Sequence, residues 1–269
     1  NHQAAGFDIL AQHGNQDRHG TAIDVADAPN PTTINLLGDG VIYGNIDIAS
    51  ADEIIVGEGT TIFDGIINLA QLADEGAAQS LATVFDGSLT IASGGTLFLR
   101  NSASNNTMYD GPSQAYVGTF NMASNATLAV EVELEATGGP SYSQVFANTA
   151  NIDGDLKVQL NGTPLIDGEM LIDNVVDADI LNGTFDSVRL LGYEASALLS
   201  LDALYDGGEN VDLSIHRVAF GQLGEETRNQ AAVGGAIEGA YQALIAGNQA
   251  TNGGNSDAFL GLAGEILRL

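Results

Sequence analysis

The chain contains no cysteine and no tryptophan, and only 7 of its 269 residues are Lys or Arg. Without cysteine it has no disulfide, no thiolate metal site and no cysteine nucleophile. The few cations face 35 Asp and Glu residues, which gives a formal net charge of −28. Such a chain cannot neutralise phosphates, and this excludes nucleic-acid binding. The same balance argues against adsorption to anionic lipid.

The composition nevertheless supports a folded core. Hydrophobic residues make up 44% of the chain, and the mean hydropathy is +0.08. Disordered segments combine high net charge with low hydrophobicity, and this chain has only the first of these properties. We therefore expect an ordered, strongly anionic protein.

Alternation of apolar and polar residues dominates from about residue 33 to residue 215. In residues 127–134 every second side chain is apolar, while Ala129, Glu131 and Glu133 take the opposite face. This period of two predicts a β-strand that is buried on one side. The same alternation recurs in residues 152–160 and 211–216.

A glycine followed two residues later by a large apolar residue forms a weak internal repeat. Its members are Gly44, Gly65, Gly87, Gly118, Gly154 and Gly183. The intervals of 21, 22, 31, 36 and 29 residues are typical of a β-solenoid with loops inserted between rungs. Such triplets also arise by chance in a chain with 34 glycines. We favour the solenoid because alternating strands accompany most of the triplets.

Beyond residue 220 the periodicity becomes helical. Residues 225–247 carry apolar side chains at helical spacing, Glu225 and Glu226 lie in the expected first turn, and Gly247 is the expected stop. The expected apolar stripe consists of Val233, Ile237, Ala240, Tyr241, Leu244 and Ile245. A second short helix is expected over residues 257–269, where the chain looks truncated.

Several segments, in order along the chain, resemble the end of the passenger of a classical (type Va) autotransporter. The matching segments are residues 118–120, 126–132, 142–145, 150–158, 183–188, 210–220 and 227–230. The resemblance implies a right-handed parallel β-helix with an autochaperone cap, a helical linker, and a translocator β-barrel that would follow Leu269. The fold class is therefore predicted to be all-β, with short C-terminal helices.

The resemblance divides the chain into four parts: an N-terminal arm or partial rung (1–29), β-helix rungs (30–117), C-terminal rungs with the cap (118–221), and the helical linker (222–269). It implies a non-catalytic stalk that supports secretion and folding and presents upstream regions on the bacterial cell surface. The implied partners are its own barrel and host-cell, matrix or self-association surfaces. The activity of any domain upstream of residue 1 stays open.

Rungs bury their apolar faces only against neighbours, so folding must start at one place and propagate. We expect the seed in residues 120–215, where the strands alternate best. Its predicted core consists of Phe120, Leu128, Val130, Val132, Ile152, Leu156, Val158, Phe185, Val211, Leu213 and Ile215.

Candidate catalytic and metal-binding residues are few. His13, Asp17, His19 and Asp24 could ligate a metal, but they lack an amphipathic frame, and solvated terminal residues are the simpler interpretation. The outward carboxylate pairs Glu131 with Glu133 and Asp153 with Asp155 would suit a glycosidase, although alternation alone produces such pairs. A lyase would also need a basic residue, for which Arg18, Arg100, Arg189 and Lys157 are the candidates.

Calcium is the remaining candidate cofactor. Asp173, Asn174, Asp177 and Asp179 form an oxygen-rich run, but it lacks the glycine and terminal glutamate of an EF-hand loop. We predict no defined cofactor site, and weak surface binding of calcium stays open.

Two alternative functions also remain. The stalk could itself be an adhesin or biofilm module, or it could bind or cleave polysaccharide. The stripe in residues 233–245 could bind a partner, but a linker helix that packs on the last rung is the preferred interpretation. Gly234, Gly235 and Gly239 weaken this helix in isolation and would allow close packing.

Overall fold

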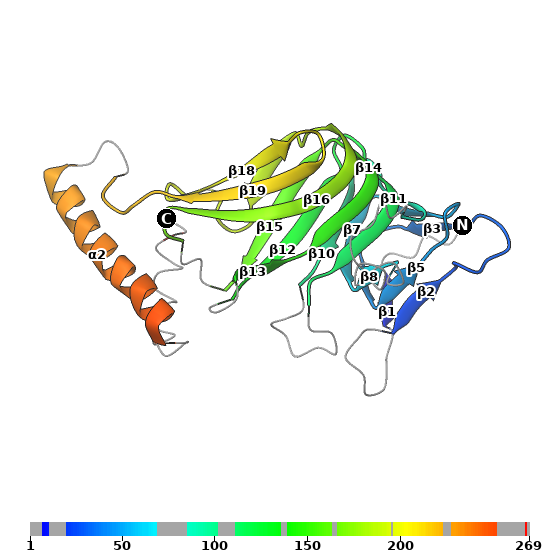
Figure 1. The fold of residues 1–269 in the computed structure, drawn as a ribbon, viewed down its shortest axis with the longest axis horizontal. Coiled ribbons are helices and arrows are strands. Elements are labelled where there is room, and N and C mark those ends of the chain that lie inside the picture. Colours follow the sequence, from blue (N-terminus) through cyan, green and yellow to red (C-terminus); the bar gives the residue numbers. More distant parts are fainter. Residues whose placement is uncertain are drawn as a thin grey trace.

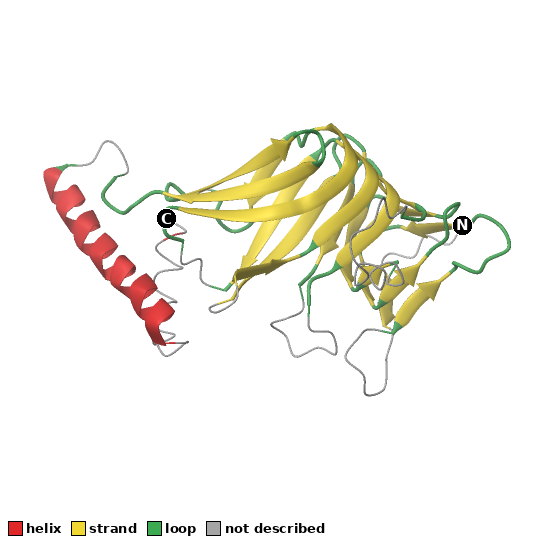
Figure 2. Cartoon of the chain, in the orientation of Figure 1, coloured by secondary structure: helices red, strands yellow, loops and turns green. Residues whose placement is uncertain are grey.

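The computed structural model describes residues 7–10, 20–68, 85–101, 111–135, 139–162, 166–194, 196–222, 227–251 and 267. Over these residues the protein is mostly β, with strands in an elongated stack and one long helix beside its C-terminal end (Figures 1 and 2). The all-β expectation is confirmed at this level.

The first sheet is a parallel ladder. In sheet order its strands are β1 (Phe7–Leu10), β4 (Gly40–Tyr43), β7 (Gly59–Asp64), β10 (Gly95–Leu99), β12 (Thr127–Glu135), β15 (Asp155–Asn161) and β17 (Ser187–Leu190). The short strand β13 (Gly139–Tyr142) pairs antiparallel with β12. Register is kept along the ladder: Thr60 pairs with Thr96, Thr96 with Thr127, and Thr127 with Asp155. Equivalent side chains therefore stand in columns.

The second sheet has two branches. Its main path is β2 (Thr21–Asp24), β5 (Asn45–Asp47), β8 (Ile66–Ile67), β11 (Gln114–Met122), β14 (Gln144–Ile152), β16 (Glu169–Gly183), β19 (Asn210–Arg217) and β18 (Leu199–Asp206). The branch consists of β3 (Thr33–Leu36), β6 (Glu53–Val56) and β9 (Ser88–Ile91). The first half of β11 pairs with β8 and its second half with β9, so the long strands span both branches.

The chain visits the ladders in a repeating order. After β3, β4 and β5 it passes through β6, β7 and β8, and each strand pairs in parallel with its counterpart in the preceding set. Side chains that alternate along each strand therefore point either into the space between the ladders or away from it. This stacking explains why the period-two pattern extends over most of the chain.

One hydrophobic cluster runs along the whole stack, from Leu36 to Leu267. Every residue predicted for the folding-seed core is buried in it, with Phe185 the most exposed at 8%. Burial follows directly from the alternation. The order of folding is a separate property, and the seed stays a prediction.

The glycines of the sequence repeat lie at several different corners of the stack, not in a single column. Gly65 stacks on Gly44, where an added Cβ would overlap the Gly44 carbonyl, and a Cβ on Gly118 would come within 3.0 Å of the Gly87 oxygen. Gly154 belongs to another position, because its Cβ would meet the carbonyl of Ala123 at 3.0 Å. The single series expected from the sequence therefore mixes separate columns, which explains its uneven intervals.

Three strands close the C-terminal end of the stack in antiparallel pairing. β19 lies between β16 and β18, and a register shift interrupts its pairing with β16 between Ile172 and Val176. Asn174, at this irregularity, has a φ of 55°. Antiparallel pairing stops the succession of parallel strands, and we call β16, β18 and β19 the cap.

The described helix α2 (Arg228–Thr251) follows the cap. It begins at a capping box, in which the Thr227 N–H donates to Gln230 Oε1 (2.8 Å) and the Gln230 N–H donates to Thr227 Oγ1 (3.3 Å). The helix continues through Gly247, so the predicted stop there is wrong. Glu225, Glu226 and all of the expected second helix except Leu267 lie outside the described residues. No helix in the described part of the chain is long and apolar enough to cross a membrane.

Candidate functional site

The best-defined polar site lies where α2 packs against the cap. We call it the cap–helix junction; its residues are Ile166, Asp167, Arg217, Phe220, Glu238, Tyr241 and Gln242. Arg217 ends β19, Phe220 lies in the following turn, and Glu238, Tyr241 and Gln242 fall within two turns of α2. The spacing of three and four residues places these helical side chains on one face, directed at the cap.

Arg217 and Glu238 form a bidentate ion pair at the centre of the junction. Arg217 Nη2 donates to Glu238 Oε1 at 2.7 Å, and Nη1 donates to Oε2 at 2.9 Å. The Arg217 side chain is 2% exposed and that of Glu238 is 19% exposed. Arg217 Nε donates to the Ile166 carbonyl (2.7 Å), and Glu238 also accepts from the Phe220 N–H (3.0 Å). The buried charge is therefore both paired and hydrogen-bonded.

Two aromatic rings enclose the guanidinium. Its carbon lies 4.4 Å from the ring centre of Tyr241 and 5.6 Å from that of Phe220, and the rings meet edge to face. The Ile166 N–H donates to the Tyr241 hydroxyl at 2.9 Å. Tyr241 is thus packed and hydrogen-bonded, which anchors the middle of the helix.

The ion pair sets the protonation of both partners. The hydrogen bond from Arg217 lowers the pKa of Glu238 from 4.5 to about 2, against the opposing effect of burial. Burial alone would lower the pKa of Arg217, but the hydrogen bond and charge of Glu238 outweigh it and raise that pKa. Burial raises the pKa of Tyr241. The site is a closed electrostatic contact, fully charged at neutral pH.

Close backbone contact completes the junction. Gly234 lies against Gly221, where an added Cβ would come within 2.5 Å of the Gly221 Cα. Nothing lies within 4 Å of a Cβ built on Gly235 or Gly239. Only Gly234, of the three helix glycines singled out in the sequence, therefore has a packing reason in this structure.

The predicted apolar stripe of α2 is divided between buried and exposed positions. Tyr241 and Ile245 are buried at 2% and 8% exposure, whereas Val233 is 61% exposed and Ile237 is 37% exposed. The side chain of Leu244 lies outside the described set. Of the five described members of the stripe, two pack on the cap and three, including Ala240, are exposed.

The carboxylate pair on β12 differs from the expectation. The sequence predicts outward faces for Ala129 and Glu131, but the structure buries both, at 4% and 1% exposure. Glu131 accepts from the Asn101 N–H (2.6 Å), and its Oε2 lies 3.8 Å from Arg100 Nε. Asn161 Nδ2 donates to Oε1 at 2.5 Å. Strand β12 is therefore covered on both sides, because polar partners satisfy a carboxylate that alternation alone would leave in water.

This arrangement does not support a glycosidase pair. A catalytic carboxylate must reach the substrate, and Glu131 is buried under Arg100, Asn101 and Asn161. In the second pair, Asp155 accepts from the Ser187 hydroxyl (2.5 Å), and Asp153 accepts from the Gly154 N–H (2.9 Å). Asp155 thus joins β15 to β17, and Asp153 closes a tight turn.

A serine and a histidine of β19 lie close together in the cap. Ser214 Oγ lies 2.9 Å from His216 Nε2 and donates to Glu169 Oε1 at 2.6 Å, while Asp202 lies 3.9 Å from the same imidazole nitrogen. In a catalytic triad the carboxylate bonds to the other ring nitrogen. Ser214 is also fully buried, so its hydroxyl cannot attack a substrate. The cluster is a partly buried polar contact between β16, β19 and β18.

The metal candidates from the sequence do not converge in the described residues. His13, Asp17 and His19 lie outside them, and Asp24 accepts from the nearby Ala26 N–H. The oxygen-rich run lies along β16 and consists of Asp173, Asn174, Asp177 and Asp179. The Asn174 N–H donates a hydrogen bond to Asp212, which is outside this run. No group of three His, Cys, Asp or Glu able to hold a metal occurs in the described part of the chain.

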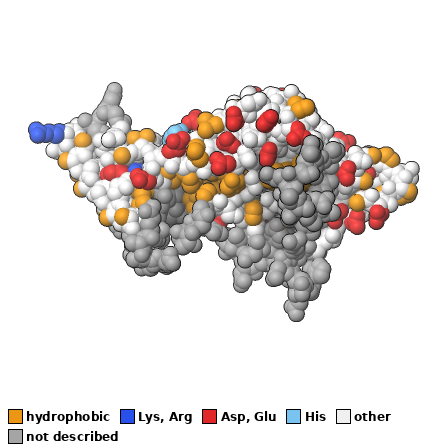
Figure 3. Space-filling view, viewed as in Figure 1, with side chains coloured by type: hydrophobic (Ala, Val, Ile, Leu, Met, Phe, Trp, Pro, Cys, Tyr) orange, Lys and Arg blue, Asp and Glu red, His pale blue; other side chains and the backbone are white. Residues whose placement is uncertain are grey.

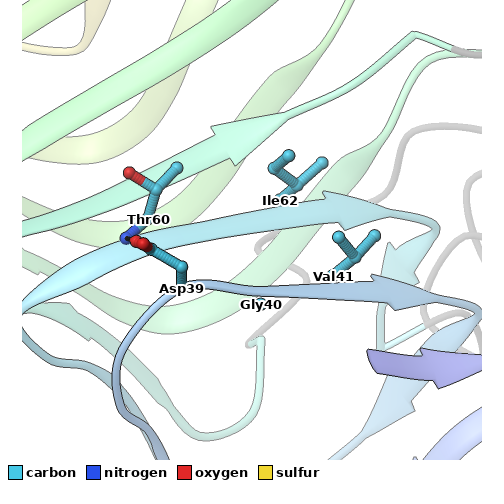
Figure 4. Close-up of a pocket in the computed structure, with 5 residues that line it drawn as sticks. All are labelled: Asp39, Gly40, Val41, Thr60 and Ile62. Carbon is cyan, nitrogen blue, oxygen red and sulfur yellow. Dashed lines mark hydrogen bonds between the residues drawn. The ribbon is translucent and has the colours of Figure 1, made fainter. Parts of the chain in front are cut away.

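Two surface hollows lie on strands of the stack. One, of about 440 Å³, lies between β4 and β7, with Asp39 and Thr60 at one end and Val41 and Ile62 on neighbouring strands (Figure 4). The Asp39 carboxylate accepts from the Thr60 N–H at 2.9 Å, so its polar end is already engaged. The other, of about 370 Å³, lies between β17 and β18 and includes Arg189 and Glu194. Neither hollow brings together an acid and a base in catalytic geometry.

The important residues that the sequence interpretation missed are Glu238, the partner of Arg217, and the pair Thr227 with Gln230. The capping box had a readable signal, because a threonine followed three residues later by glutamine is typical of a helix start. The sequence signal for Glu238 is weaker: it is the only acidic residue in residues 228–251.

No protein-family model matches the chain, and no curated protein matches it. The functional conclusion therefore depends on the fold and on the cap–helix junction.

Proposed function

We propose that the protein is a non-catalytic stalk from the passenger of an autotransporter, built as a right-handed parallel β-helix with a C-terminal cap and linker helix. The parallel ladders, which repeat in the order β3–β4–β5 and β6–β7–β8, support the β-helix. The function is to assist export and folding and to present upstream regions at the bacterial cell surface.

The observation that carries the proposal is the junction between the cap and α2. A chain that folds after export needs an end that stops strand addition and then a connection to its membrane anchor. The antiparallel cap supplies the stop, and the Arg217–Glu238 pair fixes the connecting helix to it. The proposed partner that follows Leu269 is a translocator barrel.

The acidic surface is consistent with this function. Acidic side chains are scattered over the visible face of the stack, and few basic ones accompany them (Figure 3). A net charge of −28 keeps an unfolded chain from collapsing or aggregating before it crosses a membrane.

The test is surface display in a Gram-negative bacterium. The chain is fused between an epitope tag and a translocator barrel, and tag exposure is measured by antibody binding to intact cells and by removal with external protease. We expect the tag on the surface, and less of it with Arg217→Ala. A tag that stays protected in intact cells while the barrel inserts normally would contradict the proposal. The matched control is Arg228→Ala, at an exposed position of α2.

A further inference from the structure

One outer face of the stack carries uncharged polar side chains in two columns. Strands β9, β11, β14 and β16 build it in parallel register. The intervening side chains Leu89, Phe120 and Ala150 are fully buried, so those between them point outward. We call this surface the neutral face; its residues are Ser88, Thr90, Thr119, Asn121, Thr149, Asn151 and Asn182.

The first column is a ladder of amides. Asn182 Nδ2 donates to Asn151 Oδ1 at 3.0 Å, Asn151 Nδ2 donates to Asn121 Oδ1 at 2.8 Å, and Asn121 Nδ2 lies 3.5 Å from Thr90 Oγ1. Each amide has two donor hydrogens and two acceptor lone pairs. In the ladder Asn121 and Asn151 use one donor and one acceptor each, and Asn182 uses one donor. Asn121 and Asn151 are half-buried and Asn182 is exposed, so the ladder keeps donors and acceptors that a ligand can reach.

The second column consists of the hydroxyls of Ser88, Thr119 and Thr149. These three residues are register partners on adjacent strands, Ser88 with Thr119 and Thr119 with Thr149. These hydroxyls make no side-chain hydrogen bond to any residue that the structure describes. All three residues are half-buried, so a ligand can reach them. The column ends at the exposed Ile180 on one side and at Glu53 on the other.

Neighbouring outer surfaces are charged. Strands β15 and β17 present Asp155, Lys157 and Arg189, and the cap presents Glu169 and Asp202. The four strands of the neutral face lie about 4.8 Å apart and so span roughly 14 Å. Carboxylates border the neutral face: Glu53 accepts from the Thr90 hydroxyl at 3.2 Å, and the exposed Asp179 accepts from Asn148 at 3.2 Å. Between these borders the seven residues of the face carry no charge, in a chain of net charge −28.

We propose that the neutral face binds an extended, uncharged polysaccharide laid across the strands. Its hydroxyls would bond with the free hydroxyl column and the outward half of the amide ladder. Charge decides the occupant: an acidic polymer or a second copy of this chain meets the repulsion of −28 charges, and a neutral glycan does not. This inference does not depend on the proposed export function.

The test is affinity electrophoresis of the full chain in gels that contain hydroxyethyl cellulose, mannan or dextran, with polygalacturonate as the acidic comparison. We expect retardation by at least one neutral glycan and none by polygalacturonate. The variant Thr119→Val/Thr149→Val removes two hydroxyls and keeps the β-branched shape. Two lost hydrogen bonds weaken binding by about tenfold.

The matched control is Thr60→Val/Thr96→Val, a cross-strand threonine pair on the other sheet. The control variant should bind the glycan within about twofold of the original chain. The loss expected for Thr119→Val/Thr149→Val is about tenfold, so the two outcomes are distinguishable. No retardation by any of the three neutral glycans, or equal loss in both variants, would overturn the inference. Self-association in sedimentation that Thr119→Val/Thr149→Val abolishes, without glycan binding, would instead assign the face to contact between copies.

Discussion

Two carboxylates, the buried Glu131 and the half-buried Glu238, connect parts of the chain that are distant in sequence. Glu131 on β12 accepts hydrogen bonds from Asn101 and from Asn161 on β15. Glu238 joins α2 to Arg217 and to the Phe220 backbone. Removing one partner of a buried pair leaves the other charged and unpaired, which costs more than the pair contributes.

For this reason we expect Glu238→Ala to weaken docking of α2 by about 3 kcal/mol. Hydrogen exchange of the amides of residues 228–251, followed by mass spectrometry, measures this change as faster exchange. Arg228→Ala removes an exposed charge from the same helix and should change the exchange little. Equal exchange in Glu238→Ala and the original chain would show that the ion pair does not hold the helix.

The lowered pKa of Glu238 also predicts a pH dependence. A carboxylate whose pKa falls from 4.5 to about 2 on folding stabilises the protein fully above pH 4.5. That stabilisation is lost as the pH drops toward 2. Thermal unfolding should therefore show a steeper acid loss for the original chain than for Glu238→Gln, which has no proton to gain there. Parallel curves for the two proteins would contradict the assigned pKa.

At the scale of elements, α2 combines residues that favour a helix with glycines that weaken it, and contact with the cap stabilises it. Its capping box of Thr227 and Gln230 fixes the start, while Gly234, Gly235 and Gly239 lower its intrinsic stability. Gly234 is compensated by close contact with Gly221. The helix therefore owes its position to tertiary contact more than to propensity.

Neighbouring glycines of α2 should respond oppositely to alanine. Gly234→Ala places a Cβ against the Gly221 backbone and should destabilise the junction by about 1–3 kcal/mol. Gly235→Ala points into open space and should stabilise the helix by roughly 0.5–1 kcal/mol. Urea unfolding followed by far-UV circular dichroism measures both. Stabilisation by both substitutions would mean that the close approach of Gly234 is not required.

Across the whole molecule, stability depends on stacking, because each set of strands buries its apolar side chains against the next. The longest paired strands are β11, β12, β14 and β16, which lie toward the C-terminal end, whereas β3, β5 and β8 are short. The antiparallel cap and α2 protect that same end. This distribution agrees with a folding seed in residues 120–215 without establishing it.

Limited proteolysis tests the seed directly. Pepsin or thermolysin at increasing urea should cut residues 30–117 first and leave a fragment that covers 120–215, because the longer strands open at higher free energy. Fragment masses identify the surviving half. If 30–117 proves more resistant, folding does not begin at the C-terminal end.

Much of the fold is encoded locally. Alternation in residues such as Leu128, Val130 and Val132 predicts strands and their buried side because side chains alternate across a strand. Helical spacing likewise places Tyr241 and Ile245 on one buried face of α2. These patterns depend only on backbone geometry, so the sequence by itself determined the β class, most of the core and the existence of the helix.

Tertiary structure decided which surfaces meet. Alternation gave Glu131 an outward face, but Asn101, which is distant in sequence, covers it. The partners Arg217 and Glu238 lie on different elements, and no local periodicity links them. Long-range contacts depend on how the ladders stack and how the chain returns to them. A single sequence carries no direct signal for that arrangement, so the cap–helix junction and the neutral face became visible only in the folded chain.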